Sequence, residues 1–131
     1  MSGDPHGAVV LVVDNNDVMR SSCEQVLAKS GYRVTAVATG ESALEVTASL
    51  QPAVVVMDLY LPGASGLDLI PRIHDLAPYA AVIIITGYPT IDTAVSAMKR
   101  GATDFLPKPF TPDRLRSAVA EAIAETAAVR S

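Results

Sequence analysis

The sequence predicts a single α/β domain with a doubly wound (βα)5 fold around a five-stranded parallel sheet. Short β-branched runs alternate five times with longer segments of helical spacing. Such alternation is typical of a parallel sheet that helices cover on both faces. The length of 131 residues and the apolar share of 50% suit one globular domain with an ordinary core.

The predicted elements follow one another without a linker or an internal repeat. Predicted strands cover 8–13, 33–37, 53–57, 81–86 and 103–106, and predicted helices cover 16–30, 40–50, 66–77, 90–100 and 111–128. Local chemistry supports these boundaries. Residues 15–17 can cap the first helix, Gly31 follows its last turn, and Thr111 precedes a proline at the start of the last helix.

The strands differ in a way that indicates their place in the sheet. The first, third and fourth strands are almost wholly apolar, as strands covered on both faces are. The second strand carries Arg33 and Thr35 among its valines, which indicates an edge strand.

Composition and charge argue against several kinds of protein. The net charge of −4, from fourteen acids and ten bases, argues against a basic face that binds nucleic acid. The apolar runs are too short to cross a membrane, and the amino-terminal MSGDPHG lacks the features of a signal peptide. We therefore expect a cytoplasmic protein without membrane contact. Cys23 is the one cysteine, so neither a disulfide nor a cysteine-based metal site is expected, and His6 and His74 have no partner at ligand spacing.

Reactive side chains stand at the ends of four of the five predicted strands. Asp14 and Asn15 follow the first strand, Asp58 follows the third, Thr86 ends the fourth, and Lys108 follows the fifth. Ligands of open parallel sheets bind at the carboxyl ends of the strands, so these groups are expected to meet. The acids and the amide offer hard oxygen ligands for Mg²⁺, and the lysine and the hydroxyl can hold phosphoryl oxygens. Together they are the parts needed for phosphoryl transfer to a carboxylate.

Each of these residues also has a purely structural explanation, as a turn acid, a solvated loop charge or a hydroxyl bonded to its own turn. A glycine-rich phosphate loop is not expected, because GASG at 63–66 lacks the lysine of such loops and reads as a turn. A phosphatase with an aspartyl intermediate would need a second acid just after its nucleophile, but residues 59–61 are Leu, Tyr and Leu.

Three motifs, taken in order and spacing, resemble the receiver domains of two-component response regulators. They are VLVVDNND, VVVMDLYLPGASGLDLI and VIIITGYPTIDTAVSAMKRGATDFLPKPF, and the resemblance covers about residues 8–125, with 1–7 as a loose amino terminus. It implies the strand order 2-1-3-4-5. It also implies that Asp58 accepts a phosphoryl group from a sensor histidine kinase, with Mg²⁺ held by Asp14, Asn15, Asp58 and the backbone carbonyl of Tyr60.

The resemblance assigns further roles around this site. Thr86 and Lys108 would bind the phosphoryl oxygens, and the bond between Lys108 and the following proline would be cis. Phe105 would turn inward when Thr86 moves toward the phosphoryl group. Tyr60 and Tyr88 would tune how fast water removes that group, and two bulky rings predict a long-lived phosphoform.

The resemblance also implies how the domain signals. The face formed by the fourth helix, the fifth strand and the fifth helix would change shape, and would then bind an output partner outside this chain or form a homodimer. The last motif looks like receivers that are attached to transcriptional activators. The domain would be no enzyme beyond catalysing its own phosphoryl transfer and dephosphorylation.

Asn15 departs from the family pattern, which usually has a carboxylate at this position. An amide keeps one ligand oxygen but removes a negative charge, so Mg²⁺ should bind more weakly, and Asn15→Asp should restore tight binding. The alternative is a degenerate receiver that acts as a protein-interaction module without phosphorylation. Asn15 favours that alternative, whereas the intact Asp58, Thr86 and Lys108 oppose it.

Overall fold

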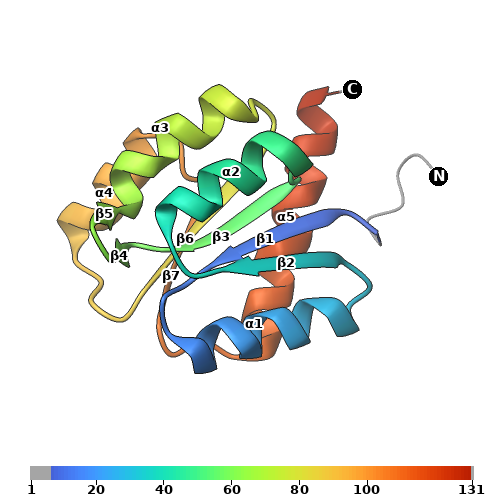
Figure 1. Cartoon of the computed structure of the whole chain (residues 1–131), viewed down its shortest axis with the longest axis horizontal. Coiled ribbons are helices and arrows are strands. Elements are labelled where there is room, and N and C mark those ends of the chain that lie inside the picture. The colour runs from blue at the N-terminus through green and yellow to red at the C-terminus, as the bar shows by residue number, and fades with distance from the viewer. Residues whose placement is uncertain (1–6, 131) are drawn as a thin grey trace.

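The computed structural model describes residues 7–130, which form a parallel sheet between two layers of helices (Figure 1). The sheet strands are β1 (Val9–Val13), β2 (Arg33–Val37), β3 (Val54–Asp58), β6 (Ala81–Thr86) and β7 (Asp104–Pro107). The helices are α1 (Asp17–Lys29), α2 (Gly40–Leu50), α3 (Gly66–Leu76), α4 (Ile91–Lys99) and α5 (Pro112–Arg130). The sheet order is β2-β1-β3-β6-β7, all parallel. The predicted fold class and the order 2-1-3-4-5 are therefore confirmed, because β6 and β7 are the fourth and fifth strands of this sheet.

The sheet separates two apolar cores. Leu11 and Val13 of β1 face the core that α2, α3 and α4 cover, whereas Val10 and Val12 face the core under α1 and α5. Successive side chains of a strand point to opposite faces, so a continuous aliphatic run fills both cores at once. Burying one such side chain contributes about 1.5–3 kcal/mol, so each of these aliphatic residues stabilises the core that it faces.

The edge position predicted for the second strand is also confirmed. β2 pairs only with β1 in the sheet order, and its residues are half-buried or exposed, with Arg33 exposed. β1, β3 and β6 are almost wholly buried by comparison.

Helix boundaries agree with the predicted ones to within two residues. At α1 the Asn16 side chain accepts a hydrogen bond of 2.9 Å from the Met19 amide, as an N-cap does. At α4 the side chains of Thr90 and Thr93 form a reciprocal capping box.

The segment after β3 is more ordered than the predicted turn. Tyr60–Leu61 (β4) and Ala64–Ser65 (β5) pair as a short antiparallel hairpin, and Gly66 already belongs to α3. Gly63 has φ +67°, a conformation that glycine adopts without strain, and the preceding proline favours a tight turn. The interpretation of 63–66 as a plain turn is thus wrong. The sequence could not reveal the hairpin, because strands of two residues are too short to show a periodicity.

Several residues without a predicted role prove to be structural. Cys23 is only 1% exposed. Burial, together with the negative charge of Asp14, raises the pKa of its thiol to about 11. His74 Nε2 lies 3.1 Å from the Ala80 carbonyl oxygen. None of the helices within residues 7–130 combines the length and the apolar character that crossing a membrane requires. His6 and the predicted loose segment, apart from Gly7, lie outside the described residues.

Candidate functional site

Four of the predicted site residues meet at the carboxyl edge of the sheet. Asp14 directly follows β1, Asp58 ends β3, Thr86 ends β6, and Lys108 directly follows β7. These strands are neighbours in the sheet, and the Lys108 amide donates a hydrogen bond of 2.7 Å to the Thr86 carbonyl oxygen. The rule that strand ends gather ligand-binding groups therefore holds for these residues.

Lys108 joins the two carboxylates. Its Nζ lies 2.9 Å from Asp14 Oδ2 and 2.9 Å from Asp58 Oδ2. The Asp14 side chain is fully buried, and those of Asp58 and Lys108 are 13% and 17% exposed. Burial of the Lys108 amine disfavours its charged form, but the hydrogen bonds and negative charges of Asp14 and Asp58 outweigh that cost and raise the pKa of Lys108. The amine is therefore a fixed positive charge between two acids.

Backbone amides orient the other oxygen of each carboxylate. Asp14 Oδ1 accepts a hydrogen bond of 2.8 Å from the Asn16 amide, and Asp58 Oδ1 accepts one of 3.0 Å from the Tyr60 amide. Each carboxylate is thus held in one orientation. One of its oxygens accepts a hydrogen bond from Lys108, and the other accepts one from a backbone amide of the segment that follows the strand.

The Thr86 hydroxyl lies buried at the same edge. Its Oγ1 accepts a hydrogen bond of 3.1 Å from the Tyr88 amide, which leaves its proton available for donation to a ligand. The bond between Lys108 and Pro109 is cis, as predicted.

Asn15 and Phe105 lie around this centre rather than within it. The Asn15 side chain is exposed beside Asp14. Phe105, on β7, is half-buried and packs against the core under α2, α3 and α4.

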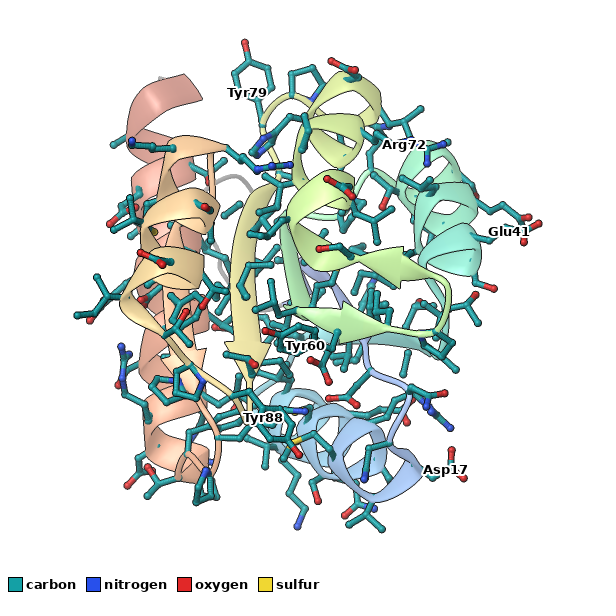
Figure 2. All side chains as sticks on the ribbon, turned by 90° about the vertical axis from the view of Figure 1, so that its left-hand side faces the viewer. Asp17, Glu41, Tyr60, Arg72, Tyr79 and Tyr88 are labelled. Carbon is teal, nitrogen blue, oxygen red and sulfur yellow. The ribbon has the colours of Figure 1, made fainter. Side chains whose placement is uncertain are left out.

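Tyr60 and Tyr88 form an aromatic pair. Their ring centroids lie 6.2 Å apart at an interplanar angle of 75°, an edge-to-face contact. Figure 2 shows the rings beside the arrowhead of β6, where the sheet edge carries the site. The pair joins the first residue of β4 to the loop after β6.

The donor set fits Mg²⁺ in its chemistry. Asp14 and Asp58 offer carboxylate oxygens, and Asn15 and the Tyr60 carbonyl offer neutral ones, all of the hard type that Mg²⁺ prefers. Within residues 7–130, no three or more His, Cys, Asp or Glu side chains form a group that could hold a metal ion. A metal at this edge would therefore depend on two carboxylates and on neutral oxygens.

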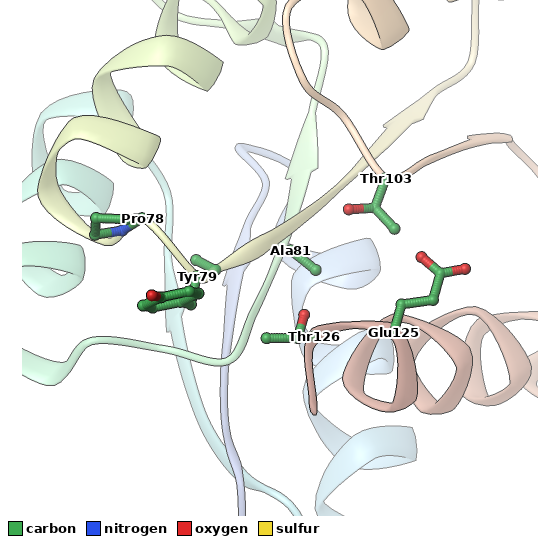
Figure 3. A pocket seen from close by; sticks show the side chains of 7 residues that line it. Pro78, Tyr79, Ala81, Thr103, Glu125 and Thr126 are labelled. Carbon is green, nitrogen blue, oxygen red and sulfur yellow. The ribbon is translucent and has the colours of Figure 1, made fainter. Parts of the chain in front are cut away.

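A cavity elsewhere in the domain contains none of these residues. It measures about 200 Å³ and opens at the amino ends of the strands, where Ala81 begins β6 and Thr103 precedes β7 (Figure 3). Thr126 of α5 closes its other side. The candidate site is at the opposite edge.

Comparison with known proteins identifies the family. The family model of the response regulator receiver domain matches residues 10–120 of this chain. This chain belongs to the response regulator receiver family.

This receiver is similar to several individual proteins. It is 40% identical over 115 residues to the DNA-binding transcriptional regulator NtrC of Escherichia coli K12. The matched region makes up 88% of this chain but only 24% of NtrC. The receiver thus spans about a quarter of that relative. A beryllofluoride-activated NtrC4 receiver domain dimer superimposes with a TM-score of 0.86 at 36% identity, over 90% of this chain and 98% of that one. A Burkholderia pseudomallei response regulator with a phosphorylated aspartic acid, calcium ion and citrate superimposes with a TM-score of 0.82 at 32% identity. That match covers 95% of this chain and 73% of the other.

Two residues that support the receiver site were missed by sequence reasoning. A Cβ on Gly66 would lie 2.8 Å from the Asp58 carbonyl oxygen, so this glycine allows α3 to start against the end of β3. Arg20 donates to the Asp14 carbonyl oxygen at 2.9 Å and to Asp17 at 2.6 Å. The spacing of Asp17 and Arg20, three residues apart in a predicted helix, was the one sequence signal for the second contact.

Proposed function

We propose that this receiver accepts a phosphoryl group on Asp58 from a sensor histidine kinase, with Mg²⁺ as cofactor. The observation that carries the proposal is the Lys108 ammonium, held at 2.9 Å from both Asp14 and Asp58 at the sheet edge. A buried cation beside an oriented carboxylate stabilises the charge that develops in phosphoryl transfer.

The chain's own residues suggest how the transfer proceeds. The Tyr60 amide orients one oxygen of Asp58, and the other oxygen lies on Lys108. A carboxylate oxygen of Asp58 would form the new P–O bond as the P–N bond to the kinase imidazole breaks. The imidazole leaves with that electron pair and takes a proton from solvent. Lys108 and the Thr86 hydroxyl would then hold the phosphoryl oxygens.

Magnesium would be held by Asp14, Asp58, Asn15 and the Tyr60 carbonyl, and it would neutralise negative charge on the transferring group. Since Asn15 contributes no charge, binding should be weaker than with a third acid. The degenerate, phosphorylation-independent receiver remains the second candidate. It is favoured by Asn15 alone and opposed by the assembled Asp58, Thr86 and Lys108.

An apolar face on α4 supports the proposed route of output. Ile91, Val95 and Met98 are 84%, 46% and 49% exposed and recur at helical spacing. In the proposed switch, phosphorylation draws Thr86 inward, Phe105 repacks, and the α4-β7-α5 face binds an output partner or a second copy.

The partners implied are a histidine kinase and an output domain or protein, with control of transcription as the proposed output. Kinase and output would meet the receiver in the cytoplasm. The receiver itself would catalyse only its own phosphorylation and dephosphorylation.

Incubation with acetyl phosphate at graded Mg²⁺, read by intact mass, tests the proposal. Wild type should gain the mass of one phosphoryl group, and Asp58→Asn should not. A wild type that stays unmodified at saturating Mg²⁺ favours the degenerate receiver, and a modified Asp58→Asn variant excludes Asp58 as the acceptor.

Asn15→Asp tests the charge argument in the same assay. One added unit charge about 4 Å from a dication in a water-like environment is worth about 2 kcal/mol, or about thirtyfold. The Mg²⁺ concentration for half-maximal phosphorylation should fall accordingly. An unchanged dependence would show that the charge at position 15 does not limit metal binding.

A further inference from the structure

Arg20 lies in the first turn of α1, and its guanidinium reaches back to join the two ends of the turn between β1 and α1. One nitrogen donates to the Asp14 carbonyl oxygen at 2.9 Å, and another donates to Asp17 Oδ1 at 2.6 Å. The Arg20 side chain is 24% exposed, whereas Asp17 is 87% exposed at the outer end of α1 (Figure 2). The fork geometry of the guanidinium lets one side chain hold both groups.

The contact fixes the peptide group that leads into Asn15. The Asp14 amide donates to the Val37 carbonyl at 3.1 Å, and the Asp14 carbonyl accepts from Arg20. The backbone on both sides of the Asp14 Cα is thus held. Asn15 follows directly and is exposed, so the position of its Cα depends on this backbone.

We infer that Arg20 is a positioning residue for the magnesium site and that it acts through the peptide between Asp14 and Asn15. The inference rests on the proposed Mg²⁺ site. A neutral ligand such as the Asn15 amide attracts a cation weakly. Its contribution to Mg²⁺ affinity therefore depends more on correct placement than the contribution of a carboxylate does.

The charge of Arg20 acts in the opposite direction, because a guanidinium repels a dication. Asp17 accompanies it at 2.6 Å, so the pair carries little net charge toward the site. Two variants separate the effects. Arg20→Gln removes both charge and fork, whereas Arg20→Lys keeps the charge and one donor group but loses the fork.

Arg100 provides a matched control. Its guanidinium also contacts a carbonyl oxygen and a carboxylate, those of Leu67 at 3.2 Å and Asp68 at 3.0 Å, but it links the end of α4 to α3 rather than to the turn after β1. Arg100→Gln therefore removes the same kind of contact without touching the turn after β1.

The experiment is calorimetric titration of each purified variant with Mg²⁺ alone, with urea unfolding in the absence of metal as the measure of folding. Changes in residues that hold metal ligands in place typically cost about 10- to 100-fold in affinity. We expect Arg20→Gln to bind Mg²⁺ about tenfold more weakly than wild type, Arg20→Lys to fall between them, and Arg100→Gln to match wild type.

The outcomes separate this inference from the proposed function. If wild type binds Mg²⁺ and Arg20→Gln binds it equally or more tightly, repulsion outweighs positioning and the inference is overturned. An equal loss of Mg²⁺ affinity in Arg100→Gln would also overturn the inference, because the loss would then follow from removing any such arginine contact. If wild type binds no Mg²⁺, the proposed metal site is overturned and the role of Arg20 is overturned with it.

Discussion

Replacing Lys108 by methionine tests the centre of the site, because it removes one charge while keeping a side chain of similar length. The change leaves Asp14, which is fully buried, and Asp58, which is 13% exposed, without their shared cation. Breaking a buried ion pair by removing one partner costs about 3–5 kcal/mol. The partial exposure of Asp58 and Lys108 lowers this, and we expect a loss of about 2–4 kcal/mol.

Urea unfolding measures that loss. For a domain of this size a slope of about 2 kcal/mol/M converts the expected loss into a midpoint lower by about 1–2 M. Mg²⁺ should then stabilise Lys108→Met more than wild type, because the metal replaces the missing charge between the carboxylates. Phosphorylation should nevertheless be lost, since the cation that is proposed to hold the phosphoryl oxygens would be gone.

Lys99→Met is the matched control, because Lys99 is exposed in the last turn of α4. It should unfold at nearly the wild-type urea concentration, and Mg²⁺ should stabilise it only as much as it stabilises the wild type. If Lys108→Met unfolds like Lys99→Met, the bridging lysine does not hold the two carboxylates, and the reasoning from its contacts fails.

Three further predictions follow from contacts around the site. Tyr88→Ala removes the ring that packs edge-to-face on Tyr60, so water should reach the proposed phosphoryl group more easily and the phosphoform should have a shorter lifetime; an unchanged lifetime would contradict a shielding role. Gly66→Ala places a Cβ 2.8 Å from the Asp58 carbonyl oxygen, so it should cost about 1–3 kcal/mol in urea unfolding and slow phosphorylation of Asp58; wild-type behaviour would mean that the backbone yields freely. Because the pKa of Lys108 is raised above the ordinary 10.5, its contribution to stability is complete below pH 10.5 and is lost as the pH rises through the folded value. The difference in unfolding free energy between wild type and Lys108→Met should shrink accordingly in alkaline buffer, and a constant difference would argue against a charged bridge.

The fold could be predicted because its determinants are local and repeated. Uninterrupted aliphatic runs such as Val9–Val13 are typical of strands that are covered on both faces, and capping residues such as Asn16 and Thr90 mark where helices begin. The hairpin of Tyr60–Leu61 and Ala64–Ser65 escaped prediction, because two-residue strands are specified by their turn and by packing rather than by periodicity.

The site could be predicted only in part, because its composition is local but its contacts are not. The strand-end rule brought Asp14, Asp58 and Lys108 to one edge, yet Lys108 and Asp14 stand 94 residues apart, and nothing local indicates that one amine bridges both acids. The contact between Tyr60 and Tyr88 likewise depends on how two separate loops lie. Sequence reasoning placed both rings at the entrance but could not place them against each other.

The bridging lysine changes what Asn15 means for the site. Two carboxylates and one ammonium leave a single net negative charge, whereas a carboxylate at position 15 would leave two. In the proposed receiver, the attraction for a dication before phosphorylation would therefore be weak, and Lys108 already occupies one oxygen of each acid. In the proposed transfer, an incoming phosphoryl group would add negative charge at the same edge and would draw Lys108 toward it, which would free carboxylate oxygens when more positive charge is needed. With Asn15 in place of a carboxylate, the free receiver should therefore bind Mg²⁺ weakly, and it should bind the metal more tightly once a phosphodonor is present.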